Sequence, residues 1–230
     1  MKLYYKPGAC PLASHIALHE TGRPFKIEAV DTAAGRTESG ADYRAINPKG
    51  YVPALGMDAG SVLTEGAAVL QYIADSSPEA GLAPAAGTPA RARMQEHLNW
   101  IGTELHKAFG PLFREGTSKA GKDAARTAVA GKFDFIETQL VEGREWLVED
   151  QFSVADAYLF VVSNWANFTG IDLARWPNLA AFVNRSAARR GTDSQDCKPR
   201  YKLFSNSQSN ALWRPCRFRR RSSKLNKSVN

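Results

Sequence analysis

Strand patterns occur only in the first 64 residues of this 230-residue chain, and this restriction limits the fold more than any other feature. Short apolar runs bounded by turn residues indicate a strand, a helix that ends near Gly22, a second strand, and a hairpin followed by another helix. We expect these strands at residues 2–6, 25–30, 52–55 and 61–64, and the later helix at 65–75. Residues 32–42 are polar and are expected to form a loop. The order βαβ, connector, ββα predicts an α/β domain over residues 1–80.

Residues 87–190 carry helical patterns alone. A segment rich in Ala, Gly and Pro at 78–89 precedes them and has the composition of a linker. Apolar residues recur at three- and four-residue steps from Met94 to Leu112, which predicts a helix that Pro111 kinks by removing a backbone donor. Further helices are expected at residues 133–141, after the capping box Ser153–Asp156, and at 179–190. We therefore predict an all-α second domain.

The basic charge of the chain is concentrated after residue 190. Residues 191–230 hold ten of the 30 Lys and Arg but only two of the 23 Asp and Glu, so the rest of the chain is nearly neutral. This segment is rich in Ser, Asn, Arg and Lys without a helical or strand period, and is expected to be a disordered tail. The pI of about 9.4 is therefore no argument that the body binds nucleic acid.

The apolar segments and the cysteines indicate in which cellular compartment the protein works. The N-terminus has no apolar core of signal-peptide length, and no stretch is long enough to span a bilayer, so we expect a cytoplasmic protein with no membrane partner. Cys10, Cys197 and Cys216 are odd in number and far apart, which argues against a disulfide framework and against a zinc site. Reduced thiols and no metal are expected.

Cys10 is the first candidate for chemistry. It precedes Pro11, a residue favoured at the first helical position, so its sulfur is expected at the positive end of a helix, where the thiolate is stabilised. The alternative is a small buried core residue. Ala13 stands where a second cysteine would complete a dithiol motif, so any redox step needs a thiol from another molecule.

Two further candidates follow in the same domain. Pro53 enters a hairpin strand, where either a cis Val52–Pro53 bond exposes the backbone of Val52 to an extended ligand, or the proline only marks an edge strand. Glu65 stands at a helix start with Gly66, where backbone amides can hold a ligand carboxylate and the Glu65 carboxylate can pair with an ammonium. Plain helix capping would need no ligand.

The helical domain supplies one more group. Asn99, Thr103 and His106 follow each other at four- and three-residue steps, so they are expected to share a helix face beside the apolar stripe. A surface histidine and a solvated Lys107 are the alternative interpretation.

Four motifs in this order resemble those of bacterial beta-class glutathione transferases. They are Tyr4–Cys10 (YYKPGAC), Ile46–Leu55 (INPKGYVPAL), Leu63–Gly66 (LTEG) and Glu104–His106 (ELH). The resemblance covers residues 1 to about 190. It implies a thioredoxin-like N-terminal domain, an all-helical C-terminal domain, a homodimer, and glutathione bound between the domains.

The resemblance also implies roles for single residues. Cys10 would meet the glutathione sulfur, with His106 as the second catalytic residue. The binding set would be Cys10, Gly35, Val52, Pro53, Glu65, Gly66, Asn99, Thr103 and His106. Many relatives have a lysine where this chain has Gly35, so a contact to the glycyl end of glutathione is either lost or passed to Arg36.

The implied function is conjugation of glutathione to small electrophiles, as in detoxification, with glutathione-dependent thiol–disulfide exchange through Cys10. The alternative is a non-catalytic glutathione-binding or regulatory protein on the same fold. The tail does not resemble the family, and a shifted reading frame after residue 190 is our leading interpretation, against an acquired nucleic-acid or membrane-surface segment. Nucleic acid is not an expected partner.

Overall fold

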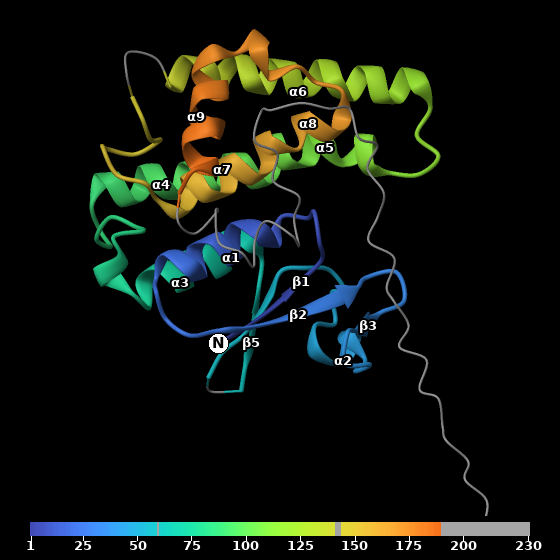
Figure 1. The fold of residues 1–230 in the computed structure, drawn as a ribbon, viewed down its shortest axis with the longest axis vertical. Helices are drawn as coiled ribbons and strands as arrows, with labels where there is room; N and C mark the ends of the chain where they lie inside the picture. Colours follow the sequence, from blue (N-terminus) through green and yellow to red (C-terminus); the bar gives the residue numbers. More distant parts are fainter. Residues whose placement is uncertain (59, 141–143, 190–230) are drawn as a thin grey trace, which may run out of the picture.

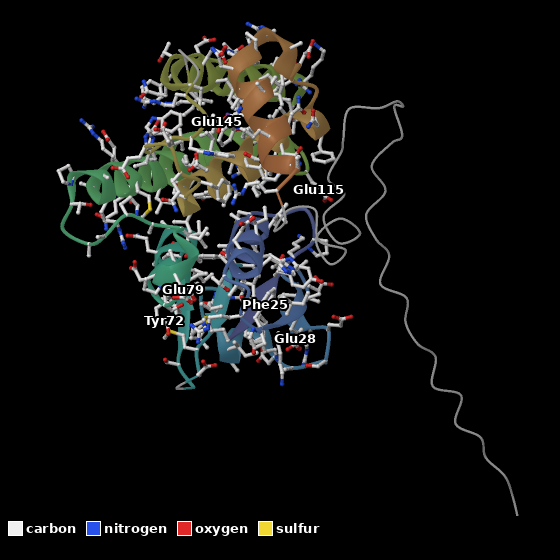
Figure 2. The ribbon with its side chains drawn as sticks, turned by 60° about the vertical axis from the view of Figure 1, so that its left-hand side comes forward. Phe25, Glu28, Tyr72, Glu79, Glu115 and Glu145 are labelled. Atoms are coloured by element: carbon white, nitrogen blue, oxygen red, sulfur yellow. The ribbon has the colours of Figure 1, made fainter. Side chains whose placement is uncertain are left out.

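The computed structural model describes residues 1–58, 60–140 and 144–189. A β-sheet forms the base of the molecule, two helices lie on it, and a layer of helices lies beyond them (Figure 1). Phe25 and Glu28 belong to the part that contains the sheet, whereas Glu115 and Glu145 belong to the helical part (Figure 2). The predicted tail at 191–230 lies outside the described residues.

The sheet has five strands in the order β3-β2-β1-β4-β5. The strands are β1 Lys2–Tyr5, β2 Lys26–Asp31, β3 Arg36–Thr37, β4 Ala54–Gly56 and β5 Val62–Thr64. β1 and β2 are parallel and the other pairs are antiparallel. This arrangement confirms the α/β domain predicted from the βαβ-ββα order and the thioredoxin-like fold that the resemblance implies.

The prediction of a loop at residues 32–42 is wrong in part, because this segment contains β3. The edge strand β3 pairs Thr37 with Val30 and Arg36 with Asp31. The short helix α2, Tyr43–Ile46, follows, and the Asp42 side chain caps it by accepting from the backbone N–H of Arg44 at 3.0 Å. Two strand residues and four helical residues are too few to show a period, so neither element was predicted.

Helices α1, Pro11–Glu20, and α3, Gly66–Asp75, cover one face of the sheet (Figure 1). Residues 11–18 of α1 are all buried because the sheet lies below this helix and the helical domain above it. On the opposite face Tyr4, Val30 and Ala54 pack with Tyr43 of α2 in a smaller apolar cluster. The domain is thus a sheet with packed side chains on both faces.

The remaining described helices form the second domain. They are α4 Pro89–Trp100, a π-helical turn η2 Ile101–Leu105, α5 His106–Phe113, α6 Lys119–Gln139, α7 Val154–Asn164, α8 Ala166–Thr169 and α9 Pro177–Ala187, with 3₁₀ turns η1 Pro78–Ala80 and η3 Leu173–Arg175. The all-helical prediction is confirmed. The break in α-helical geometry falls at η2 and not at Pro111, which lies inside the last turn of α5.

One continuous hydrophobic core runs through both domains. α1 packs on α7, and the backbone N–H of Val154 donates to the carbonyl of Leu82 at 2.9 Å. The predicted capping box at Ser153 and Asp156 is confirmed at the start of α7, a helix buried along its whole length. The domain limits at residues 80 and 87 stay a prediction. None of the described helices has the length and apolar character needed to cross a membrane.

Candidate active site

Cys10 lies at the N-cap of α1, at the side of the first domain that faces the helical domain. Pro11 occupies the first turn, and the backbone N–H of Ala13 donates to the Cys10 carbonyl at 3.0 Å. The loop before it is tied across the domain boundary, because Trp165 Nε1 donates to the Gly8 carbonyl at 3.2 Å. The thiol is therefore placed by both domains.

The thiol itself differs from the expectation of a thiolate. Cys10 is partly buried and packs against the core, and its Sγ lies 3.7 Å from the carbonyl oxygen of Val52, to which the thiol donates. Burial raises the pKa of the Cys10 thiol to about 12. Desolvation of the charged form outweighs the helix dipole here, so the group is a protonated hydrogen-bond donor at neutral pH.

The segment before Pro53 is held in place by buried side chains. The Val52–Pro53 bond is cis, which confirms one of the two alternatives for this proline. The carbonyl of Tyr51 accepts from Asn47 Nδ2 at 2.7 Å and from the Tyr43 hydroxyl at 3.0 Å. Since Asn47 and Tyr43 are buried, they fix the backbone that brings Val52 beside the Cys10 thiol.

Glu65 is a backbone outlier at the start of α3. Its φ is +70° and its ψ is +115°, a conformation that a non-glycine residue rarely adopts. Its side chain does not cap the helix, so the interpretation as a plain cap is wrong. The Glu65 carboxylate accepts from Lys49 Nζ at 2.5 Å and from the Tyr51 hydroxyl at 2.8 Å.

These two donors determine the charge of Glu65. The hydrogen bond from Lys49, followed by that from Tyr51, holds the Glu65 pKa below its usual value. The carboxylate is therefore ionised and more than half exposed, while the first amides of α3, from Gly66 onward, lack intrahelical partners by geometry. Backbone amides that can bind an anion and a carboxylate that can bind a cation therefore lie side by side at the start of α3.

His106 stands at the first position of α5, directly after the π-helical turn. Its Nδ1 lies 2.7 Å from the Tyr158 hydroxyl oxygen, and its ring lies 4.9 Å from the Trp165 ring. Burial, and secondarily the charge of Lys107, lowers the His106 pKa to about 4. The imidazole is neutral at pH 7.

The predicted face shared by Asn99, Thr103 and His106 is only partly formed. Asn99 and Thr103 are exposed, and the Thr103 hydroxyl donates to the Asn99 carbonyl at 2.9 Å, whereas His106 is turned inward to Tyr158. Within the described residues, neither Asn99 nor Thr103 makes a hydrogen bond to the first domain.

Gly35 lies between β2 and β3 with φ +65°, where a side chain would be strained, and its carbonyl accepts from the Tyr43 N–H at 2.9 Å. Arg36, the alternative contact for the glycyl end, donates to the Gly40 carbonyl at 3.2 Å.

Four residues of the site were not predicted in their roles. Lys49 and Tyr51 orient Glu65, and Tyr158 and Trp165 contact His106. Tyr158 carried a signal, because a tyrosine in an otherwise apolar, buried helix needs a partner for its hydroxyl. Across residues 1–58, 60–140 and 144–189 no cluster of three or more His, Cys, Asp or Glu is arranged to hold a metal ion.

Family models match both parts of the chain: the glutathione S-transferase N-terminal domain over residues 1–75 and the C-terminal domain over residues 101–190. The chain is 46% identical to glutathione S-transferase GstA of Escherichia coli O157:H7 over 189 residues, which cover 82% of this chain and 94% of that protein.

Two solved structures are similar over nearly their whole length. A bacterial beta-class glutathione S-transferase of Sphingomonas chungbukensis has 47% identity and a TM-score of 0.81, covering 84% of this chain and 95% of that one. A sphingomonad glutathione S-transferase in complex with glutathione has 46% identity, a TM-score of 0.81 and the same coverage. Sequence and fold agree, and the chain belongs to the glutathione S-transferase family.

Proposed function

We propose that the chain conjugates glutathione to small electrophiles at the boundary between its domains. The observation that carries the proposal is that Trp165 links two uncharged groups there: its indole N–H donates to the carbonyl of Gly8, two residues before Cys10, and its ring lies edge to face against the ring of His106. Uncharged donors such as the Cys10 thiol and His106 stabilise a glutathione thiolate, the nucleophile that attacks an electrophile. The relatives named above support glutathione as the co-substrate.

Each end of glutathione finds matching groups. The amides at the start of α3, with Gly66 first, suit the γ-glutamyl carboxylate, and the ionised Glu65 suits its ammonium. The backbone of Val52 beside Pro53 suits the cysteinyl unit in the manner of an added strand. Asn99 and Thr103 lie on the exposed side of the second domain and are proposed to close the site.

The glycyl end has the weakest anchor. Gly35 supplies no side chain, and Arg36 is engaged with Gly40, so the proposed contact there is made only if Arg36 exchanges its partner.

The proposal is tested by passing the full chain over glutathione-agarose and assaying turnover of 1-chloro-2,4-dinitrobenzene with glutathione. Retention together with turnover is the expected result. Retention without turnover, and without thiol transfer, would support the alternative of a non-catalytic glutathione-binding protein.

Glu65→Gln is expected to raise the KM for glutathione about tenfold, because a neutral amide loses the charge that pairs with the ammonium. The substitution leaves the fold intact, since the pair with Lys49 is exposed and such pairs add little stability.

Glu96→Gln is the matched control for the Glu65 variant. It removes a carboxylate that pairs with Arg93 on α4, where both side chains are also exposed. The KM of the control should equal that of the wild type. Equal KM values for all three proteins would contradict the role of Glu65.

We also propose a cytoplasmic homodimer. Several large apolar side chains away from this site are more than a third exposed in the single chain, among them Val62, Phe113 and Phe135. Exposed apolar surface is one signature of a protein interface. Analytical ultracentrifugation of the full chain at micromolar concentration should give twice the 25.2 kDa mass of one chain. A single species with the mass of one chain would refute the proposed dimer.

A further inference from the structure

The hydroxyl of Tyr158 is a buried polar group that the proposed reaction does not yet use. Tyr158 lies on α7 and is 6% exposed. Its hydroxyl oxygen is 2.7 Å from His106 Nδ1, and the two rings meet edge to face with centroids 5.9 Å apart. Within the described part of the chain this hydroxyl has no other hydrogen-bond partner.

The backbone of the second domain is adapted to this contact. The π-helical turn η2, Ile101–Leu105, lies directly before His106, whose backbone N–H donates to the carbonyl of Ile101 five residues earlier. Gly102 lies in this turn, and a Cβ there would be in van der Waals contact with the Tyr158 hydroxyl oxygen at 3.6 Å, so the turn lies directly beside that hydroxyl. π turns are rare and concentrate at functional sites.

The hydrogen bond between the two residues has one direction that satisfies every group. Burial, with the nearby Cys10 and Glu65, raises the Tyr158 pKa, so the phenol keeps its proton, while the His106 pKa of about 4 leaves the imidazole neutral. If Nδ1–H donated to Tyr158, the phenol hydrogen would be buried without an acceptor. Donation from the Tyr158 O–H to Nδ1 leaves no orphan donor.

The direction of this bond decides which ring nitrogen of His106 carries hydrogen. An imidazole that accepts at Nδ1 carries its proton on Nε2, the opposite side of the ring. Nε2–H is then a donor, and the atom it can serve is the sulfur of a glutathione bound beside Cys10. The opposite tautomer would present a lone pair to that sulfur and would not stabilise negative charge.

We propose that Tyr158 is a positioning residue that fixes His106 as the Nε2–H tautomer, so that His106 acts as a hydrogen-bond donor to the glutathione sulfur. The hydrogen bond from His106 to the glutathione sulfur rests on the proposed function, whereas the assignment of the Nε2–H tautomer does not.

Tyr158→Phe tests the proposal because it removes only the hydroxyl. We expect kcat for conjugation to fall about tenfold, since His106 then loses both its fixed tautomer and the hydrogen bond that orients its ring, while the KM for glutathione changes less than twofold. Thermal unfolding should remain close to that of the wild type. Tyr72→Phe removes the hydroxyl of an exposed tyrosine on α3, at the outer side of the first domain (Figure 2), and should leave kcat unchanged.

A second measurement reads the tautomer without any substrate. The ¹⁵N spectrum of histidine-labelled protein at pH 7 should show an unprotonated Nδ1 and a protonated Nε2 for His106, with His106→Gln used to identify the signals among the four histidines. In Tyr158→Phe both signals should move toward the values of a tautomer mixture.

The outcomes separate the two proposals. A protonated Nδ1 in the wild type, or an unchanged kcat in Tyr158→Phe, would overturn the positioning role. The expected spectrum in a protein without turnover would overturn the proposed function and support the tautomer. Both proposals are supported when the wild type gives the expected spectrum and kcat falls tenfold in Tyr158→Phe but not in Tyr72→Phe.

Discussion

Asp156→Ala is expected to lower the free energy of unfolding by about 3 kcal/mol, a large part of the stability of an ordinary domain. Asp156 is fully buried at the start of α7. Its carboxylate accepts from the backbone N–H of Leu147 at 2.8 Å, from the backbone N–H of Ser153 at 2.9 Å and from the Ser153 hydroxyl at 2.7 Å. Alanine leaves these donors buried without an acceptor.

The position of this network explains why its loss affects the whole molecule. Asp156 orders the chain before α7, and α7 packs against both α1 and the helices of the second domain. Because α1 carries Cys10 at its start, a loosened α7 is expected to disturb the site as well. Urea unfolding followed by circular dichroism measures the loss.

Asp172→Ala is a matched control for Asp156→Ala. Asp172 also caps a helical turn, accepting from the backbone N–H of Ala174 at 3.0 Å, but this cap is exposed to solvent. Its loss should cost no more than about 1 kcal/mol, since water can satisfy the freed amide. Equal losses in the two variants would show that burial of the Asp156 network contributes nothing.

The pH dependence of stability provides a second check on Asp156. Burial raises the pKa of Asp156 to about 6, above the usual value of 3.8 for an aspartate, in spite of the hydrogen bonds that favour the charged form. The folded state therefore holds more protons than the unfolded state between about pH 4 and pH 6, so this group's contribution falls as the pH rises through that window. Asp156→Ala should lack this falling component.

The elements that the sequence predicted best are those marked by local chemistry. Pro11 at the first turn of α1 and the capping box before α7 act through the residues next to them, so their signals survive in any tertiary context. The hairpin of β4 and β5 also follows from nearby turn residues, whereas the cis bond at Pro53 was one of two alternatives that the sequence left open. The family resemblance rested on the same short motifs.

The features that were missed depend on contacts distant in sequence. β3 forms because Thr37 pairs with Val30 at the sheet edge. The π turn before His106 lies beside Tyr158, a residue 52 positions later than His106 in the chain. Glu65 was recognised as a candidate, but its strained backbone and its bonds to Lys49 and Tyr51 are tertiary properties. No periodicity in a single sequence encodes such pairs.

Replacing Cys10 is expected to abolish glutathione-dependent thiol–disulfide exchange while conjugation continues. In the proposed exchange the Cys10 thiolate attacks the glutathione sulfur of a mixed disulfide, forms a Cys10–glutathione disulfide and releases the other thiol. The thiolate of a second glutathione then attacks that sulfur, which regenerates Cys10 and yields oxidised glutathione. Since Ala13 rules out a second thiol in the motif, no other residue there can replace Cys10.

Cys10→Ala and Cys10→Ser separate the covalent role from the donor role. Both variants should lose exchange to the level of the uncatalysed reaction, and neither should carry a glutathione adduct at position 10 in peptide mass spectrometry. Serine keeps an O–H that can donate where the thiol does, so Cys10→Ser should retain most conjugation while Cys10→Ala loses about tenfold. Exchange that persists in either variant would contradict the assignment.

The pH dependence of exchange in the wild type discriminates between the two descriptions of Cys10. A thiol held as thiolate by the helix N-terminus would give a rate of Cys10 attack that is flat above neutral pH. A thiol whose pKa is raised to about 12 by burial holds only a small thiolate fraction, which grows tenfold with each pH unit, so the rate of the first step should rise about tenfold per unit between pH 7 and 9. Single-turnover formation of the Cys10 adduct measures this step without the second glutathione. A plateau in that range would mean that the helix dipole, and not desolvation, controls the sulfur.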